Sequence, residues 1–139
     1  MSYEEKGTWV YALVALGAWT TYVVIVLGRA DGGDPTHVAY VPTLIWTVVV
    51  SALAPTLGRV LVEVVRPSDT HRADVRDREI DRRGEYVGGI VLGVAMVGPF
   101  ALALADADTF WVANAIYTAY VLAAVVGSAV KLVAYRRGL

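Results

Sequence analysis

Four long stretches of uncharged, mostly apolar residues alternate with short polar segments along this chain. The stretches are residues 8–28, 38–58, 86–105 and 109–130, and none of them contains Lys, Arg, Asp or Glu. A helix rises about 1.5 Å per residue, so about 20 such residues cross the ~30 Å hydrocarbon core of a bilayer. Soluble bundles carry charges on their outer faces, whereas these stretches are apolar on all sides. The pattern predicts one all-α domain over residues 1–139, an integral membrane four-helix bundle with helices at about 8–28, 38–62, 86–105 and 109–135.

Composition narrows the class of protein. Hydrophobic residues make up 57% of the chain, above the ~45–50% that is typical of soluble domains. The formal net charge of −1 argues against direct nucleic-acid binding, which needs a surplus of basic residues. The chain has no cysteine, which excludes disulfides, thiolate nucleophiles and zinc sites that use Cys.

The distribution of Lys and Arg predicts the orientation in the membrane. Eleven of the 12 basic residues flank one side of the four stretches, and the other side has only Arg29. Lys and Arg are retained on the cytoplasmic side. We therefore expect a multi-pass protein of the cell (plasma) membrane with both termini and the segment at 66–85 in the cytoplasm.

The chain resembles itself at an offset of 77 residues without gaps. Thirteen of the 62 aligned positions are identical, and the polar identities include Asp31 with Asp108 and Arg59 with Arg136. The offset superposes the first two helices on the last two. It predicts two tandem, parallel helical hairpins related by an axis along the membrane normal, although shared hairpin composition is an alternative explanation.

The insert at 66–85 is the only segment with a distinctive charge pattern. It holds six acidic and six basic residues, 12 of the 25 formal charges of the chain. Pro67 ends the second helix and residues 68–70 offer N-cap oxygens, so a short cytoplasmic helix at 69–85 is expected. Acid-to-base pairs four residues apart would support an exposed helix. The residues expected to dock a cytoplasmic partner are Arg76, Asp77, Arg78, Glu79, Asp81, Arg82 and Arg83; a solvated helix that only sets topology is the alternative.

The run from Arg76 to Gly84, which leads directly into an apolar helix, resembles a motif of small uncharacterised prokaryotic four-helix membrane proteins. In that group an Arg/Asp-rich segment with Ile and a basic residue before Gly precedes the third helix; Asp77, Ile80, Arg83 and Gly84 match it. Members of the group resemble one another over nearly the whole chain. Genes of the group often lie beside a small helix-turn-helix regulator, so the resemblance implies a regulatory or sensing role and a transcription regulator as partner. It implies no catalytic residues.

Polar residues within the stretches are few and uncharged, and most are expected to pack or to bond their own helix. His37 and Asn114 align in the repeat and are candidates for a polar outer vestibule. His37 and His71 are expected on opposite sides of the membrane, which argues against a shared haem or metal. We expect no catalytic residues, no metal and no cofactor. The expected helix-packing residues, within the chain or in a homodimer, are Gly84, Gly88, Gly89 and Gly93.

Two functions are compatible with this pattern. The first is a non-enzymatic regulatory or sensing membrane protein that docks a cytoplasmic partner through its charged insert. The second is a small transporter or channel subunit with a wet pathway between the two hairpins, lined by Thr20, Thr47, Ser51, Asn114, Thr118 or Ser128. The absence of an ionisable residue in the apolar stretches weighs against proton-coupled export.

Overall fold

The structure is a computed structural model that describes residues 3–65, 67 and 75–137. It is all-α over these residues and contains no strand there. The elements in chain order are α1 (Tyr3–Ala30), the 3-10 helix η1 (Pro35–His37), α2 (Val41–Val65), α3 (Val75–Ala95), α4 (Val97–Leu104) and α5 (Thr109–Arg137).

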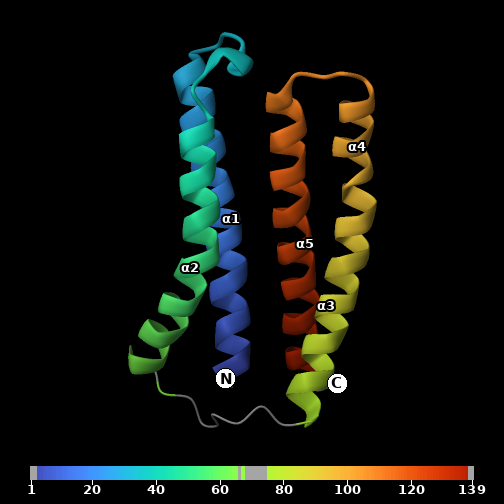
Figure 1. Cartoon of the computed structure of the whole chain (residues 1–139). Helices are drawn as coiled ribbons and strands as arrows, with labels where there is room; N and C mark the ends of the chain where they lie inside the picture. Colours follow the sequence, from blue (N-terminus) through green and yellow to red (C-terminus); the bar gives the residue numbers. More distant parts are fainter. Residues whose placement is uncertain (1–2, 66, 68–74, 138–139) are drawn as a thin grey trace.

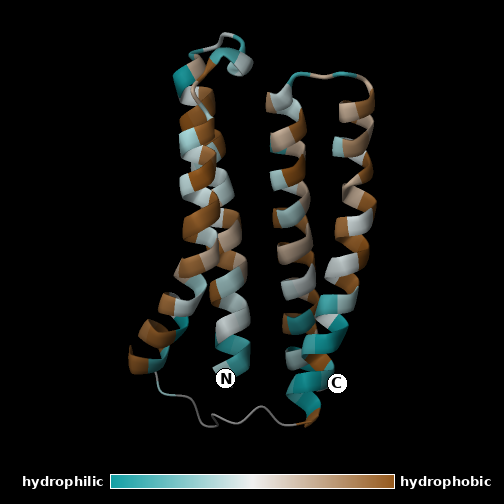
Figure 2. Cartoon of the chain, in the orientation of Figure 1, coloured by the Kyte–Doolittle hydropathy of each residue, from teal (hydrophilic) through white to brown (hydrophobic). Residues whose placement is uncertain are grey.

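Four helical spans are long and apolar enough to cross a membrane. They are α1, α2, the stacked pair α3 and α4, and α5. Large apolar side chains remain exposed along all of them, for example Leu13, Leu57 and Leu104 at 62%, 70% and 74%. An exposed apolar surface of this extent is stable only where lipid replaces water. In Figure 2, hydrophobic residues, coloured brown, recur along the length of the spans, and hydrophilic residues gather at the starts of α1 and α3 and at the loop before α2.

The helices form a row rather than a closed square. α1 packs against α2 and α5, and α5 packs against α1, α3 and α4. Among the described residues, α2 makes no comparable contact with α3, α4 or α5. The order across the bundle is therefore α2, α1, α5 and then α3 with α4, and the described ends of the chain lie at the same end of the bundle (Figure 1).

The core lies where α1 meets α5. Tyr22 is 1% exposed and its ring makes an edge contact with Tyr117, with centroids 5.5 Å apart. Val26, Phe110 and Val121 complete the buried cluster. Large aromatic rings at this contact supply packing that lipid cannot supply between two helices.

The first loop is longer than the charge-free pattern predicts. Residue 38 is not the start of α2, which begins at Val41, because Asp34 caps a separate 3-10 turn. The Asp34 carboxylate accepts hydrogen bonds from the Thr36 backbone N–H (2.9 Å) and hydroxyl (2.8 Å). Pro35, whose fixed φ suits the first position of a helical turn, follows the cap.

α3 runs without a break from Val75 into its apolar part, so its charged turns do not form a helix of their own. The expected caps at residues 68–70 and the expected helix start at 69 lie outside the described residues. The break comes later, at Met96, between α3 and α4. Pro99 explains it, because proline lacks an N–H and its ring clashes with the carbonyl of Ala95, four residues earlier.

Candidate functional site

Three acidic residues of α3 form a stripe that faces α5. Asp77, Asp81 and Glu85 follow one another at intervals of four residues, which places them on one side of the helix. The Lys131 ammonium donates hydrogen bonds to Asp81 Oδ1 at 2.5 Å and to Glu85 Oε1 at 3.2 Å. The Tyr135 hydroxyl, one turn further along α5, donates to Asp77. We call these five residues the acidic seam.

The seam continues the packing of α3 on α5. Ile80 is 2% exposed, and a Cβ atom at Gly84 would overlap the side chain of Lys131. A Cβ atom at Gly127 would lie 3.0 Å from the Gly84 carbonyl oxygen and 3.5 Å from the Gly88 Cα. Asp77, Ile80 and Gly84 therefore share the face that α5 covers. This shared face gives a structural reason for the spacing of the Asp, Ile and Gly in the motif.

Two arginines lie next to the acidic stripe on the exposed side of the same turns. Arg78 and Arg82 are exposed, lie one turn apart and form no ion pair with any described residue. Arg83 pairs with Glu79 at 3.1 Å further round the helix. Arg76 donates to the Tyr135 carbonyl oxygen at 3.3 Å. The residues expected to form one docking surface thus have different contacts: some bind α5, Glu79 and Arg83 bind each other, and Arg78 and Arg82 are exposed.

A similar arrangement joins α1 to α2. The Arg59 guanidinium lies over Gly7, where a Cβ atom would overlap it, and donates to Glu4 at 2.6 Å. Its carbon lies 5.0 Å from the centroid of the Tyr3 ring, a cation–π distance. Lys6 and Glu63 pair at 3.7 Å beside it. The contacts of α1 with α2 and of α3 with α5 therefore share one arrangement. The first helix supplies a carboxylate and a glycine three residues later, and the second helix supplies the cation.

The cation of the second arrangement is not the one that the gapless repeat predicts. The offset of 77 aligns Arg59 with Arg136, but Lys131 is the residue that lies over Gly84. Arg136 instead lies 5.9 Å from the centroid of the Trp9 ring. The aligned aspartates also differ, because Asp31 follows α1 with φ 46°, whereas Asp108 accepts a hydrogen bond from the Phe110 N–H at the start of α5.

The candidate vestibule residues lie on different elements. His37 ends η1 and is exposed, and Asn114 lies in the second turn of α5. The Asn114 amide donates to the Phe110 carbonyl oxygen at 2.8 Å. No hydrogen bond joins His37 to Asn114 among the contacts of the described residues.

The four expected packing glycines divide into two pairs. Gly84 and Gly88 lie against α5, where an added Cβ atom would meet Lys131 or the backbone of Ala123 and Gly127. An added Cβ atom at Gly89 or Gly93 would have no neighbour within 4 Å, and both glycines are exposed on α3. The first pair therefore packs within the chain, and the second pair does not.

Hydroxyl groups within the apolar spans bond mainly to their own helices. Thr20, Thr47, Ser51 and Thr118 each donate to the carbonyl oxygen four residues earlier, at 2.7–3.0 Å. Two hydroxyls of the described residues also accept bonds from another helix: Thr118 from the Trp19 indole at 3.2 Å and Thr43 from the Arg29 guanidinium at 2.9 Å. These contacts satisfy the hydroxyl donors locally, as is usual for Ser and Thr in membrane helices.

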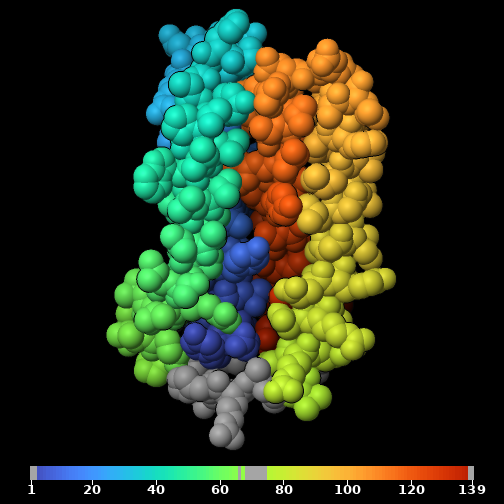
Figure 3. Space-filling view, viewed as in Figure 1, coloured from blue at the N-terminus to red at the C-terminus, as the bar shows by residue number. Residues whose placement is uncertain are grey.

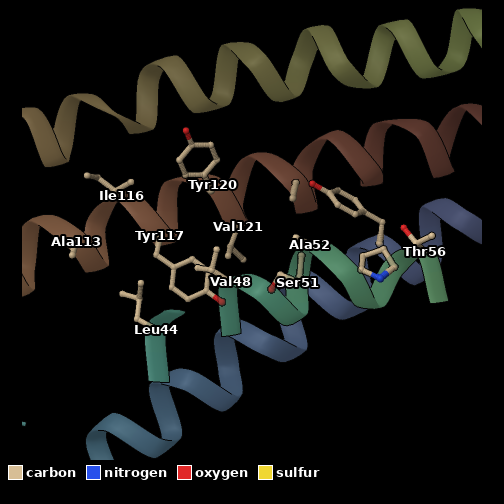
Figure 4. Close-up of a pocket in the computed structure, with 14 residues that line it drawn as sticks. Leu44, Val48, Ser51, Ala52, Thr56, Ala113, Ile116, Tyr117, Tyr120 and Val121 are labelled. Atoms are coloured by element: carbon tan, nitrogen blue, oxygen red, sulfur yellow. The ribbon is translucent and has the colours of Figure 1, made fainter. Parts of the chain in front are cut away.

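Two cavities lie between the helices. The larger, of about 770 Å³, is bounded by α1, α2 and α5, and its labelled lining residues are mainly apolar (Figure 4). The smaller, of about 300 Å³, lies between α1, α3 and α5 and includes Glu85, Ser128 and Lys131. Figure 3 shows the hollow between α2 and the two helices α5 and α4. The described residues contain no cluster of three or more metal-ligating side chains.

The acidic seam was not anticipated from the sequence. The interval of four between Asp77, Asp81 and Glu85 is visible in the chain, but their partner Lys131 lies 46 residues after Glu85. The position of Lys131, directly after the apolar stretch at 109–130, could have indicated such a contact. The methylene chain of a lysine can lie along an apolar surface while its ammonium reaches polar groups.

The fold and these contacts define a multi-pass membrane protein of four spans. No family model matches the chain, and neither the curated proteins nor the solved structures include a match. The resemblance to small prokaryotic four-helix membrane proteins therefore stays a prediction, and the function is inferred from the geometry.

Proposed function

We propose that this chain is a small, non-enzymatic regulatory protein of the cell membrane that docks an acidic cytoplasmic protein through the outer face of α3. The observation that carries the proposal is the separation of charge on that helix. Lys131 and Tyr135 bind the acidic side, while Arg78 and Arg82 remain exposed without a described ion-pair partner. The insert, although neutral in composition, therefore offers two exposed arginines that no described acid neutralises.

Arginine suits such a docking role. Its planar guanidinium donates two parallel hydrogen bonds to a carboxylate, and the turn between Arg78 and Arg82 repeats that geometry. A partner helix with carboxylates one turn apart would match it, as an acidic face of a transcription regulator could. Such a contact favours specificity and rapid association more than high affinity.

A site-specific crosslinking experiment tests the proposal. A photoreactive residue at Glu79, between the two arginines, is expected to crosslink a soluble protein in cells. The double change Arg78→Glu and Arg82→Glu should abolish the adduct, whereas Arg78→Lys and Arg82→Lys should weaken it and Arg137→Glu should leave it unchanged. An adduct that persists in the charge-reversed protein would show that the outer face does not dock the partner.

The orientation is part of the same proposal. Eleven of the 12 basic residues flank one side of the spans, and the starts of α1 and α3 and the end of α5 lie at one end of the bundle (Figure 1). Retention of Lys and Arg in the cytoplasm supports placing this end inside the cell. The outer face of α3 would then be accessible to soluble proteins.

We also propose that the two halves are tandem hairpins, with a register that differs from the gapless alignment. The carboxylate and glycine of each half keep the offset of 77 residues, Glu4 with Asp81 and Gly7 with Gly84. The overlying cations, Arg59 and Lys131, are 72 residues apart. A shorter second loop would account for most or all of this change of five, because ten residues lie between α1 and α2 and four between α4 and α5, a difference of six.

The transporter alternative has weaker support. Its expected lining groups are largely bonded to their own helices, and the larger cavity has mainly apolar walls.

A homodimer through the exposed glycines Gly89 and Gly93 of α3 is a further proposal, because small exposed residues allow close approach of a second helix. A single cysteine at Gly93 would test it, since the chain has no other cysteine to crosslink.

A further inference from the structure

The larger cavity crosses the middle of the membrane-spanning region. On α5 its lining runs from Ala113 to Ala124, inside the uncharged stretch 109–130. On α2 it runs from Leu44 to Thr56, again inside an uncharged stretch. None of the described residues that line it is Asp, Glu, Lys, Arg or His. A charged group near the middle of a bilayer is costly, so a molecule that enters this cavity is uncharged.

One buried tyrosine hydroxyl at this cavity has no partner. Tyr117 lines the cavity and is 7% exposed, and its hydroxyl forms no hydrogen bond with any described residue. Figure 4 shows its ring extending from α5 toward α2. An unpaired buried donor costs free energy, and lipid tails contain no acceptor at this depth that could satisfy it. A molecule in the cavity with an acceptor oxygen would remove this cost, whereas a hydrocarbon chain would not.

The other walls favour a flat, apolar molecule. The rings of Tyr11 and Tyr120 line the cavity together with small side chains such as Ala52 and Ala124. Flat rings pack well against aromatic side chains, and alanines leave room for them. The Ser51 hydroxyl on α2 donates its proton to its own helix, so it does not compete for an acceptor oxygen. The volume of about 770 Å³ is within the range of about 300–1,000 Å³ that is usual for ligand sites.

We propose that the larger cavity binds an uncharged lipophilic molecule with a carbonyl oxygen on a flat ring, which is the chemistry of an isoprenoid quinone. The ring lies among the tyrosines, its carbonyl accepts a hydrogen bond from the Tyr117 hydroxyl, and the apolar tail extends into the surrounding lipid. Because such a molecule is uncharged and mostly apolar, it dissolves in the bilayer interior, at the depth of the cavity. The site is independent of the docking proposed for Arg78 and Arg82, because no described residue of α3 lines it.

Thermal unfolding of the full chain in a neutral maltoside detergent tests the site. Binding to the folded state raises Tm, so decylnaphthoquinone should raise Tm more than decylnaphthalene, which has the same ring and chain without the carbonyls. Tyr117→Phe keeps the ring and removes the hydroxyl, and it should weaken quinone binding by about fivefold, the effect expected from loss of one neutral hydrogen bond. Tyr22→Phe removes a buried hydroxyl from the same aromatic cluster but outside the cavity lining, and it should leave quinone binding unchanged.

A second pair of variants tests the space itself. Ala52 is exposed on the wall of the cavity, so Ala52→Phe should fill space without disturbing the core and should reduce the effect of the quinone. Leu53→Phe adds bulk at an exposed position outside the lining and should have no such effect. Equal effects of the quinone and the naphthalene on the wild type would assign the hollow to hydrocarbon chains, and a dimer that responds to neither compound would assign it to a second copy. Either result, or equal losses in the Tyr22 and Tyr117 variants, would overturn the proposal.

Discussion

The contact between α3 and α5 gives the sharpest prediction for stability. Gly127 of α5 faces the backbone of α3, where an added Cβ atom would lie 3.0 Å from the Gly84 carbonyl oxygen and 3.5 Å from the Gly88 Cα. Both neighbours are main-chain atoms within a continuous helix, so they cannot rotate away as a side chain does. Gly127→Ala must therefore push the two helices apart or distort one of them.

The magnitude follows from two opposing contributions. Overpacking in a close contact costs about 1–3 kcal/mol. Replacing Gly by Ala within a helix is favourable by up to about 1 kcal/mol, and this gain applies wherever the helix continues. Gly17→Ala provides a matched control, because nothing lies within 4 Å of the added carbon and it is in α1, which also packs on α5. The difference between the two variants removes the propensity contribution and should equal the packing cost.

The assay is reversible unfolding in mixed micelles, followed by circular dichroism as the fraction of denaturing detergent rises. We expect Gly127→Ala to be less stable than Gly17→Ala by about 1–3 kcal/mol in the free energy of unfolding. Gly127→Ser should be at least as destabilising as Gly127→Ala. Equal stability of the two alanine variants would show that α3 and α5 do not approach this closely.

Three further predictions follow from the polar contacts. Lys131→Met should lower the free energy of unfolding by about 1 kcal/mol in the same assay, because both carboxylates are largely exposed, and Lys131→Arg should recover part of the loss. Hydrogen bonds from Thr36 hold the pKa of Asp34 below its ordinary value of 3.8. The ionised carboxylate therefore stabilises the folded state above pH 3.8, and this stabilisation is lost as the pH falls through the lowered pKa. Asp34→Asn should flatten the dependence of Tm on pH between pH 3.8 and the lowered pKa. In intact cells an impermeant maleimide should label a single cysteine at Asp106 and not one at Arg137, and the reverse result would contradict the proposed orientation.

The apolar spans could be predicted from the sequence because lipid imposes one requirement along their whole length. Each of the four uncharged stretches coincides, within three residues at its ends, with part of one helical span of the described chain. The break at Met96 also has a local cause, the proline three residues later. The apolar spans and the helix break depend on residues that are close in the sequence, so they can be predicted from a single sequence.

Features that depend on distant residues were predicted less well. The gapless alignment paired Arg59 with Arg136, but Lys131 is the residue that lies over Gly84 as Arg59 lies over Gly7. The expected short helix at 69–85 is not separate in its described part, because α3 continues from Val75 through Gly84 and Gly88, against which α5 packs closely.

The contacts of α3 explain why the insert contains as many acidic as basic residues. Lys and Arg set the orientation of a membrane protein, and Asp and Glu contribute little to it. A topology signal alone therefore does not explain the regular spacing of the carboxylates. The acidic seam explains three of them, because Asp77, Asp81 and Glu85 fasten α3 to Lys131 and Tyr135 of α5. The same bonds hold Arg78 and Arg82 outward in a fixed register. A partner that pulls on these arginines would also pull on the seam, which connects this end of α3 directly to the packing of the fourth span.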